Sequence, residues 1–192
     1  MSSSLAVPRR ALSGRQADTV ARLVTATVEE LRSRPAERLT VRRVAARAGV
    51  SPATAYTYFA SRDHLVAEVF RQRLAALPSP GSTGDASADR VAAALGAVAT
   101  LVADEPELAA ACTVALLADD PEVARLRDAI GAEIADRIRR AHPDTIDDER
   151  LAVLGLVFSG AMLQAGMGYL DYRDLPDRLA VATSIILSEE AA

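Results

Sequence analysis

The sequence predicts an all-α protein of about nine helices, arranged as a small N-terminal module and a larger C-terminal bundle. Apolar residues recur at spacings of three and four along most of the chain, and no stretch needs a strand to explain its pattern. The charge differs between the two parts: residues 1–74 hold 13 Arg against 6 acidic residues, whereas residues 75–192 hold 9 Arg against 20 acidic residues. A basic module joined to an acidic bundle is therefore expected.

The first two helices are defined by an apolar stripe and by a cap. The first helix ends before Pro35, because the residue before a proline disfavours helical geometry. Its stripe has helical spacing and consists of Val20, Leu23, Val24, Thr27, Val28 and Leu31. Thr40 is a suitable N-cap for a second helix over 41–48, and Gly49 ends that helix.

The third and fourth helices follow without a long loop. Ser51 is a preferred N-cap, and Pro52 suits the first helical position, so a third helix is expected from there to about Phe59. Ser61 is then a suitable cap for a fourth helix that ends at Pro78.

The segment after the fourth helix is rich in Pro, Gly and Ser and is expected to be a linker. Five helices should follow it, the third of which is begun by Asp120 and Pro121. Their expected ranges are 88–103, 106–118, 121–141, 147–172 and 176–188. The chain is thus divided into an N-terminal domain over 1–77, a linker over 78–87 and a C-terminal domain over 88–192.

Composition excludes several classes of function. The single cysteine, Cys112, permits no intrachain disulfide, and with only two histidines a cluster of metal-binding residues is not expected. The chain contains no nucleophile motif and no Gly-rich phosphate loop, so we expect neither an enzyme nor a cofactor. Cys112 lies in an apolar stretch, which favours an inert buried thiol over a redox sensor.

Two segments bear on localisation. Residues 1–10 have no apolar run of the kind found in export signals, which favours the cytoplasm. Residues 151–170 carry no charge and are long enough to cross a bilayer, but four glycines, Ser159 and Gln164 dilute their hydrophobicity. We therefore expect a helix that is buried on all sides, and no membrane partner.

Residues 40–59 have the spacing of a helix-turn-helix unit, whose second helix enters the major groove of DNA. Arg42 and Arg43 lie in the first turn of the first of these helices, where the helix dipole disfavours cations. Either DNA or an acidic neighbour such as Glu37 would offset them. The following helix offers only small or hydroxyl-bearing residues at its surface: Ser51, Ala53, Thr54, Tyr56, Thr57 and Tyr58. A surface without acids favours DNA over a protein partner.

The segment from Leu39 to Leu65, LTVRRVAARAGVSPATAYTYFASRDHL, closely resembles the N-terminal signature of the tetracycline-repressor (TetR) family of transcriptional regulators. The resemblance implies a homodimer that binds double-stranded DNA at a palindromic operator. It also implies a C-terminal domain for dimerisation and for an unidentified small-molecule effector, and release of a repressor from DNA when that effector binds.

The resemblance also implies roles for individual residues. Thr40 and Tyr56 match phosphate contacts, although Tyr56 also fits a half-buried spacer. Positions that often face bases are Arg42, Ala53, Thr54 and Tyr58, whereas Phe59 should lie in the core. Arg62 stands where the family usually has Lys, and a phosphate contact is expected there as well.

An effector pocket is expected among the helices at 88–103, 106–118, 121–141 and 151–170, with apolar walls that suit an apolar or acyl-bearing molecule. Its candidate lining residues are Leu95, Val98, Cys112, Leu116, Ile130, Phe158, Met162 and Gln164. The dimer interface is expected on the last two helices, where small residues permit close approach. Its candidates are Gly155, Ser159, Gly160, Leu179 and Ile186.

Overall fold

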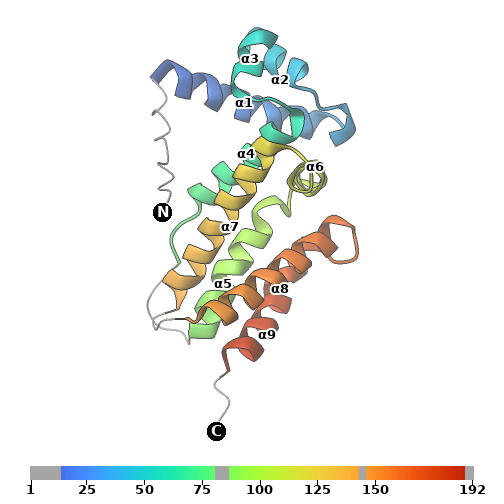
Figure 1. Cartoon of the computed structure of the whole chain (residues 1–192). Helices are drawn as coiled ribbons and strands as arrows, with labels where there is room; N and C mark the ends of the chain where they lie inside the picture. The colour runs from blue at the N-terminus through green and yellow to red at the C-terminus, as the bar shows by residue number, and fades with distance from the viewer. Residues whose placement is uncertain (1–13, 81–86, 143–145, 189–192) are drawn as a thin grey trace.

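The computed structural model describes residues 14–80, 87–142 and 146–188. Within these ranges the chain forms nine α-helices and three short 3₁₀ helices, so the all-α prediction is confirmed. Figure 1 shows α1, α2 and α3 gathered at one end of the molecule, with α8 and α9 toward the other. Helix α4 runs from this head into the body, where it packs against α6 and α7.

The head consists of α1 (Gly14–Ser33), α2 (Val41–Arg47) and α3 (Pro52–Tyr58). Both predicted caps are present: the hydroxyl of Thr40 accepts from the Arg43 backbone N–H, and that of Ser51 from the Thr54 backbone N–H.

Gly49 gives the turn after α2 its shape. It has a φ of +66°, a left-handed conformation that favours glycine. The Val50 N–H bonds to the Ala45 carbonyl at 3.0 Å, and the Gly49 N–H to the Ala46 carbonyl at 3.3 Å. These two bonds end α2 and direct the chain into α3.

The body consists of α4 (Arg62–Ala76), α5 (Ser87–Ala99), α6 (Pro106–Leu116), α7 (Pro121–Ala141), α8 (Asp148–Gly166) and α9 (Leu175–Leu187). Ser61 caps α4 and Asp120 caps α7, as predicted. Helix α5 packs against both α7 and α9, and α8 packs against α9. One connected apolar core extends from the head through the body.

Helix α8 ends at Gly166, six residues before the predicted end at 172. Gly168 has a φ of +81°, and the Tyr169 N–H bonds to the Gln164 carbonyl at 3.0 Å. This is the same type of termination that ends α2. The prediction failed because the apolar pattern continues past the glycine.

Two other predicted helices are also shorter than expected. The helix expected over 88–103 is α5 followed by a 3₁₀ turn at Thr100–Val102, and the helix expected over 106–118 ends at Leu116. No helix in the described part of the chain is both long and apolar enough to span a bilayer. Residues 1–10, which lack the pattern of an export signal, and most of the predicted linker lie outside the described residues.

Candidate DNA-binding surface and ligand cavity

Helix α3 has one buried side and one exposed side. Ala55 is fully buried and Phe59, the residue after the helix, is 3% exposed, so this side anchors α3 to the head as predicted for Phe59. The opposite side carries no acidic or basic residue. Its exposed members are Ser51, Ala53, Thr54, Tyr56 and Thr57, while Tyr58 is half-buried. Tyr56 is 48% exposed, so its side chain can reach a phosphate, and the alternative of a half-buried spacer stays open.

The hydroxyl groups of this surface are in part already bonded within the head. The Ser51 and Thr54 hydroxyls lie 2.8 Å apart, and the Thr57 hydroxyl donates to the Ala53 carbonyl at 3.0 Å. Thr40 only accepts a bond as the cap of α2, so its own proton remains available to a phosphate oxygen.

The two arginines at the start of α2 have different environments. Arg43 pairs with Glu30 of α1 at 3.3 Å, and Arg47 binds the same carboxylate at 2.7 Å. The acidic neighbour of Arg43 is therefore Glu30, whereas the sequence had suggested Glu37. The hydrogen bond from Arg47 is the largest effect lowering the pKa of buried Glu30. Arg42 is exposed and forms no hydrogen bond or ion pair with any residue that the structure describes.

Arg62 is bound to its own chain. Its guanidinium lies 3.2 Å from the Asp63 carboxylate and donates to the Ala36 carbonyl at 3.4 Å, and the residue is half-buried. An acidic partner offsets the cost of a cation at the start of α4. Arg62 is thus less available to DNA than Arg42.

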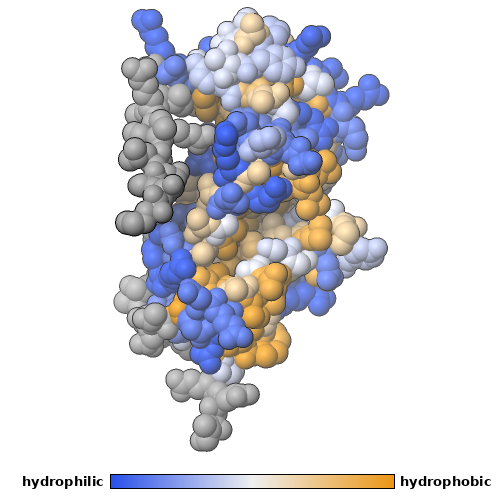
Figure 2. Space-filling view, in the orientation of Figure 1, coloured by the Kyte–Doolittle hydropathy of each residue, from blue (hydrophilic) through white to orange (hydrophobic). Residues whose placement is uncertain are grey.

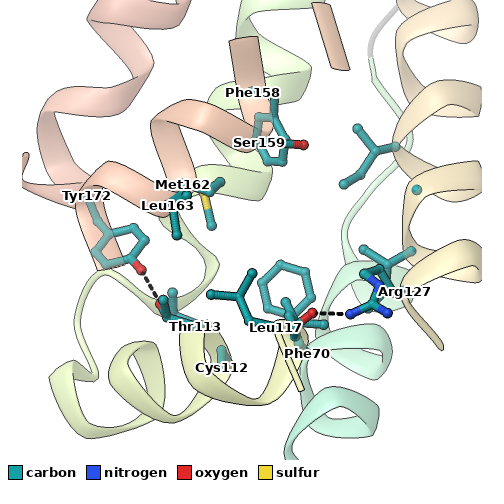
Figure 3. A pocket seen from close by; sticks show the side chains of 15 residues that line it. Phe70, Cys112, Thr113, Leu117, Arg127, Phe158, Ser159, Met162, Leu163 and Tyr172 are labelled. Atoms are coloured by element: carbon teal, nitrogen blue, oxygen red, sulfur yellow. Dashed lines mark hydrogen bonds between the residues drawn. The ribbon is translucent and has the colours of Figure 1, made fainter. Parts of the chain in front are cut away.

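A cavity of about 270 Å³ lies in the body between α4, α6, α7 and α8 (Figure 3). Five of the predicted lining residues lie on its wall: Cys112, Leu116, Ile130, Phe158 and Met162. Leu95 and Val98 do not line it, because α5 turns them into the apolar core, and Gln164 is exposed. Lining residues that the sequence did not indicate are Phe70, Val102, Thr113, Leu117, Arg127, Gly131, Ile134, Ser159, Leu163 and Tyr172.

In Figure 3 the Thr113–Tyr172 pair and Arg127 lie on opposite sides of the cavity, and Ser159 adds a hydroxyl on the α8 wall. On one side the hydroxyls of Thr113 and Tyr172 are 3.3 Å apart, and burial raises the pKa of Tyr172. On the other side Arg127 donates to the Leu116 carbonyl at 2.6 Å. Burial also raises the pKa of the Cys112 thiol to about 12, which fits an inert thiol.

Helix α4 is attached to α7 at both ends. At its N-terminus the Ser61 hydroxyl donates to the Asp120 carboxylate at 2.6 Å. At its C-terminus buried Arg137 donates to the carbonyls of Leu74, Leu77 and Pro78 at 2.9, 3.0 and 2.8 Å. The end of α4 is therefore fixed even though a Pro- and Gly-rich segment follows it.

The head also contacts α6. The Ala36 backbone N–H donates to the Glu107 carboxylate at 2.6 Å, and Arg32 donates to Glu105 at 2.9 Å. Glu105 also pairs with Arg73 of α4. The head is thus joined to both α6 and α7, the helices that supply much of the cavity wall.

Helices α8 and α9 share an exposed apolar face. Figure 2 shows apolar residues gathered over the part of the body where these helices lie. Large side chains exposed on the two helices are Val153, Leu156, Leu163, Val181 and Ile185. Within one chain α8 buries only Leu154, Phe158 and Ala165, and the expected burial on all sides would require a second subunit over its exposed face.

The predicted dimer residues do not all lie on this face. Gly160 is exposed, and a Cβ placed on Gly155 or Gly160 would meet no atom within 4 Å. Ser159 is exposed but lines the cavity, and Ile186 is half-buried against the core. Leu179 is 1% exposed and was wrongly predicted, because α9 turns its Leu175–Leu179–Thr183 stripe inward.

Similarity to known proteins agrees with this geometry. Residues 23–69 match the profile of bacterial regulatory proteins of the tetR family. An uncharacterized HTH-type transcriptional regulator of Mycobacterium tuberculosis is 43% identical over 176 residues, covering 91% of this chain and 83% of that protein.

The fold is similar to a TetR transcriptional regulator from Rhodococcus sp. RHA1, with a TM-score of 0.77 and 20% identity over 91% of this chain and 98% of that one. It is also similar to Thermus thermophilus FadR, a TetR-family repressor in complex with lauroyl-CoA, with a TM-score of 0.61 and 18% identity over 90% of this chain and 97% of that one. This chain therefore belongs to the TetR family of helix-turn-helix transcriptional regulators and is not an enzyme.

Proposed function

We propose that this regulator is a repressor that binds a palindromic operator as a homodimer in the cytoplasm and is released by a small, mostly apolar effector. The DNA-binding part of this proposal rests on the exposed face of α3. It has hydroxyl groups and no acids, and the exposed Arg42 on the neighbouring helix is not paired within the described residues. Such a surface meets phosphates without repulsion, and a free guanidinium suits bidentate contact with a guanine.

Homodimer formation is supported by the exposed apolar face of α8 and α9. Leu156, Val181 and Ile185 are 74%, 63% and 72% exposed in the single chain. Contiguous apolar surface of this kind mostly marks an interface in a water-soluble protein. A two-fold dimer would place the two α3 helices on successive major grooves, about 34–36 Å apart.

Effector control is supported by the position of the cavity. Its walls come mainly from α6, α7 and α8, and α4 contributes Phe70. Because α4 continues directly from the head, a ligand that moves α6 or α7 changes the contacts that hold the head. To weaken operator binding a hundredfold, the effector must favour the DNA-incompetent state by about 2.7 kcal/mol.

Selection from a random duplex library at about 0.15 M salt tests the proposal, and an enriched inverted repeat is the expected result. On that operator, Arg42→Ala should cost about 1–3 kcal/mol of binding free energy and relax the preference at one base position. Tyr56→Phe should weaken binding about equally on all sequences, because it removes a phosphate contact. Competition binding with operator variants measures both effects.

Arg139→Ala is the control for these variants, since Arg139 is an exposed arginine on α7 in the body. An equal loss on every sequence for Arg42→Ala would reassign Arg42 to a phosphate. If no duplex is enriched and binding does not weaken with added salt, the DNA-binding proposal is wrong and the head serves another partner.

A further inference from the structure

The cavity contains one charged side chain. Arg127 is the one basic residue among those that line it, and none of them is a carboxylate. The guanidinium of Arg127 donates to the Leu116 carbonyl, a neutral group. No carboxylate of the described residues pairs with it, whereas the neighbouring Arg125 pairs with Glu122 on the same helix. The positive charge at the cavity is therefore not compensated.

A guanidinium has five N–H donors in a planar arrangement that matches a carboxylate. The bond to Leu116 leaves most of these donors available. Arg127 is exposed, while the wall beside it is apolar. An anion bound there would be partly removed from water, and its attraction to the guanidinium would be stronger than at an open surface.

The rest of the cavity suits an aliphatic chain. Phe70 and Met162 lie between Arg127 and the Thr113–Tyr172 pair in Figure 3, and Ile130 and Phe158 extend the apolar wall. Those two hydroxyls bond to one another and carry no charge. The volume of about 270 Å³ is sufficient for the tail of a medium-length chain.

We propose that the effector is an aliphatic carboxylic acid of medium chain length, with its tail in the cavity and its carboxylate paired with Arg127. This inference rests on the proposed effector-controlled function. The chain also connects the Arg127 site to the head. Leu116 is the last residue of α6, and the three residues after it lead to Asp120, which accepts the hydrogen bond from Ser61. A carboxylate that binds the free donors of Arg127 therefore lies beside the hydrogen bond that joins Arg127 to this connection.

Octanoate, octanol and octylamine are matched probes that share a tail and differ in head-group charge. Calorimetry is the suitable measurement, because the chain has no tryptophan to report binding by fluorescence. We expect octanoate to bind at least about tenfold more tightly than octanol, and octylamine to bind weakest. A preference for octanol or octylamine would overturn the inference without any variant being needed.

Arg127→Gln should weaken octanoate binding at least about tenfold and leave octanol binding within about twofold, while Arg127→Lys should recover part of the loss. Arg125→Gln is the matched control and should change neither. Equal losses for octanoate and octanol would mean that Arg127 has only a structural role. Octanoyl-CoA distinguishes the source of the anion: if it binds more tightly than octanoate and depends equally on Arg127, phosphate recognition replaces the carboxylate assignment.

Operator binding by the same protein separates this inference from the proposed function. If the selected duplex is bound but octanoate neither binds nor releases it, the carboxylate inference alone is wrong. If no duplex is selected and binding does not weaken with added salt, the proposed repressor function fails whatever the result with octanoate.

Discussion

The two ends of helix α4 are attached to the same neighbour, α7, by different chemistry. At the C-terminal end, the guanidinium of Arg137 is 5% exposed and supplies hydrogen bonds to three backbone carbonyls. At the N-terminal end, beside the head, a single bond joins the half-buried Ser61 and Asp120 side chains. The first attachment is a buried cation and the second is a polar pair near solvent.

This difference indicates which end of α4 can move at a lower cost in free energy. Opening the Arg137 attachment leaves the buried guanidinium with Glu133 as its remaining partner and removes its hydrogen bonds to one buried and two partly buried carbonyls, which is costly. Opening the Ser61–Asp120 bond exposes groups that water then solvates. The C-terminal end is thus the fixed end of α4. Displacement of the head changes the Ser61 bond, the contacts from Glu105 and Glu107 of the α6 region, and the packing of α1 against α6.

Replacement of Arg137 should have the largest effect. Arg137→Met keeps the length of the side chain but leaves the carbonyls of Leu74, Leu77 and Pro78 without their donor. We expect the free energy of unfolding to fall by about 2–3 kcal/mol. Urea denaturation followed by circular dichroism measures this, with Arg139→Met, at an exposed site on the same helix, as the control. A loss no greater than that of the control would show that the C-terminal end is not the fixed one.

Replacement of Ser61 should have a smaller effect. Ser61→Ala removes the cap of α4 and the bond to Asp120, and we expect a loss of about 1 kcal/mol. Ser61→Thr keeps the hydroxyl and is the matched control. A double-mutant cycle with Asp120→Ala separates the two contributions, because Asp120→Ala removes the acceptor of the Ser61 bond and its own effect on the cap of α7 cancels in the cycle. A coupling energy near zero would contradict the attachment proposed for this end.

The sequence was most informative where the determinants are local. Thr40, Ser51 and Ser61 each accept a hydrogen bond from the backbone N–H three residues later, and a glycine ends α2 by its left-handed conformation. These features depend on a few consecutive residues, so the residue types predict them. The helix-turn-helix was recognised for the same reason.

The sequence was less informative where contacts join distant residues. Glu30 lies 13 residues from Arg43, whereas the expected partner, Glu37, is nearer in sequence. Arg127 and Arg137 lie on one helix and look alike in sequence, yet one lines the cavity and the other is buried beneath α4.

The orientation of each helix about its axis accounts for the other errors. Leu95, Val98 and Leu179 were assigned to the pocket or the dimer face, and the packing of α5 against α9 turns them into the core. Apolar spacing shows that a helix has a buried side. It does not show whether that side meets a core, a cavity or a second subunit.

Lowering the pH should affect the stability contributed by the two ends of α4 differently, and this is the smallest of the expected effects. The hydrogen bond from Ser61 is the largest effect lowering the pKa of Asp120 in the folded chain. A lowered pKa contributes stability that is present above the pKa of the unfolded chain and is lost as the pH falls through the folded pKa. The difference in free energy of unfolding between the wild type and Ser61→Ala should therefore be smaller at acidic pH than at pH 7, by roughly a few tenths of a kcal/mol.

The backbone carbonyls bound by Arg137 do not titrate, so the difference between the wild type and Arg137→Met should persist over the same pH range. Urea denaturation of the wild type and both variants across that range measures the two differences side by side. Asp120→Asn is the control, since the effect of Ser61→Ala in that background should no longer depend on pH. If the Ser61→Ala difference stayed constant in the wild-type background, Ser61 would act only as the cap of α4, and the N-terminal end would lack the charged contact that separates it from the C-terminal end.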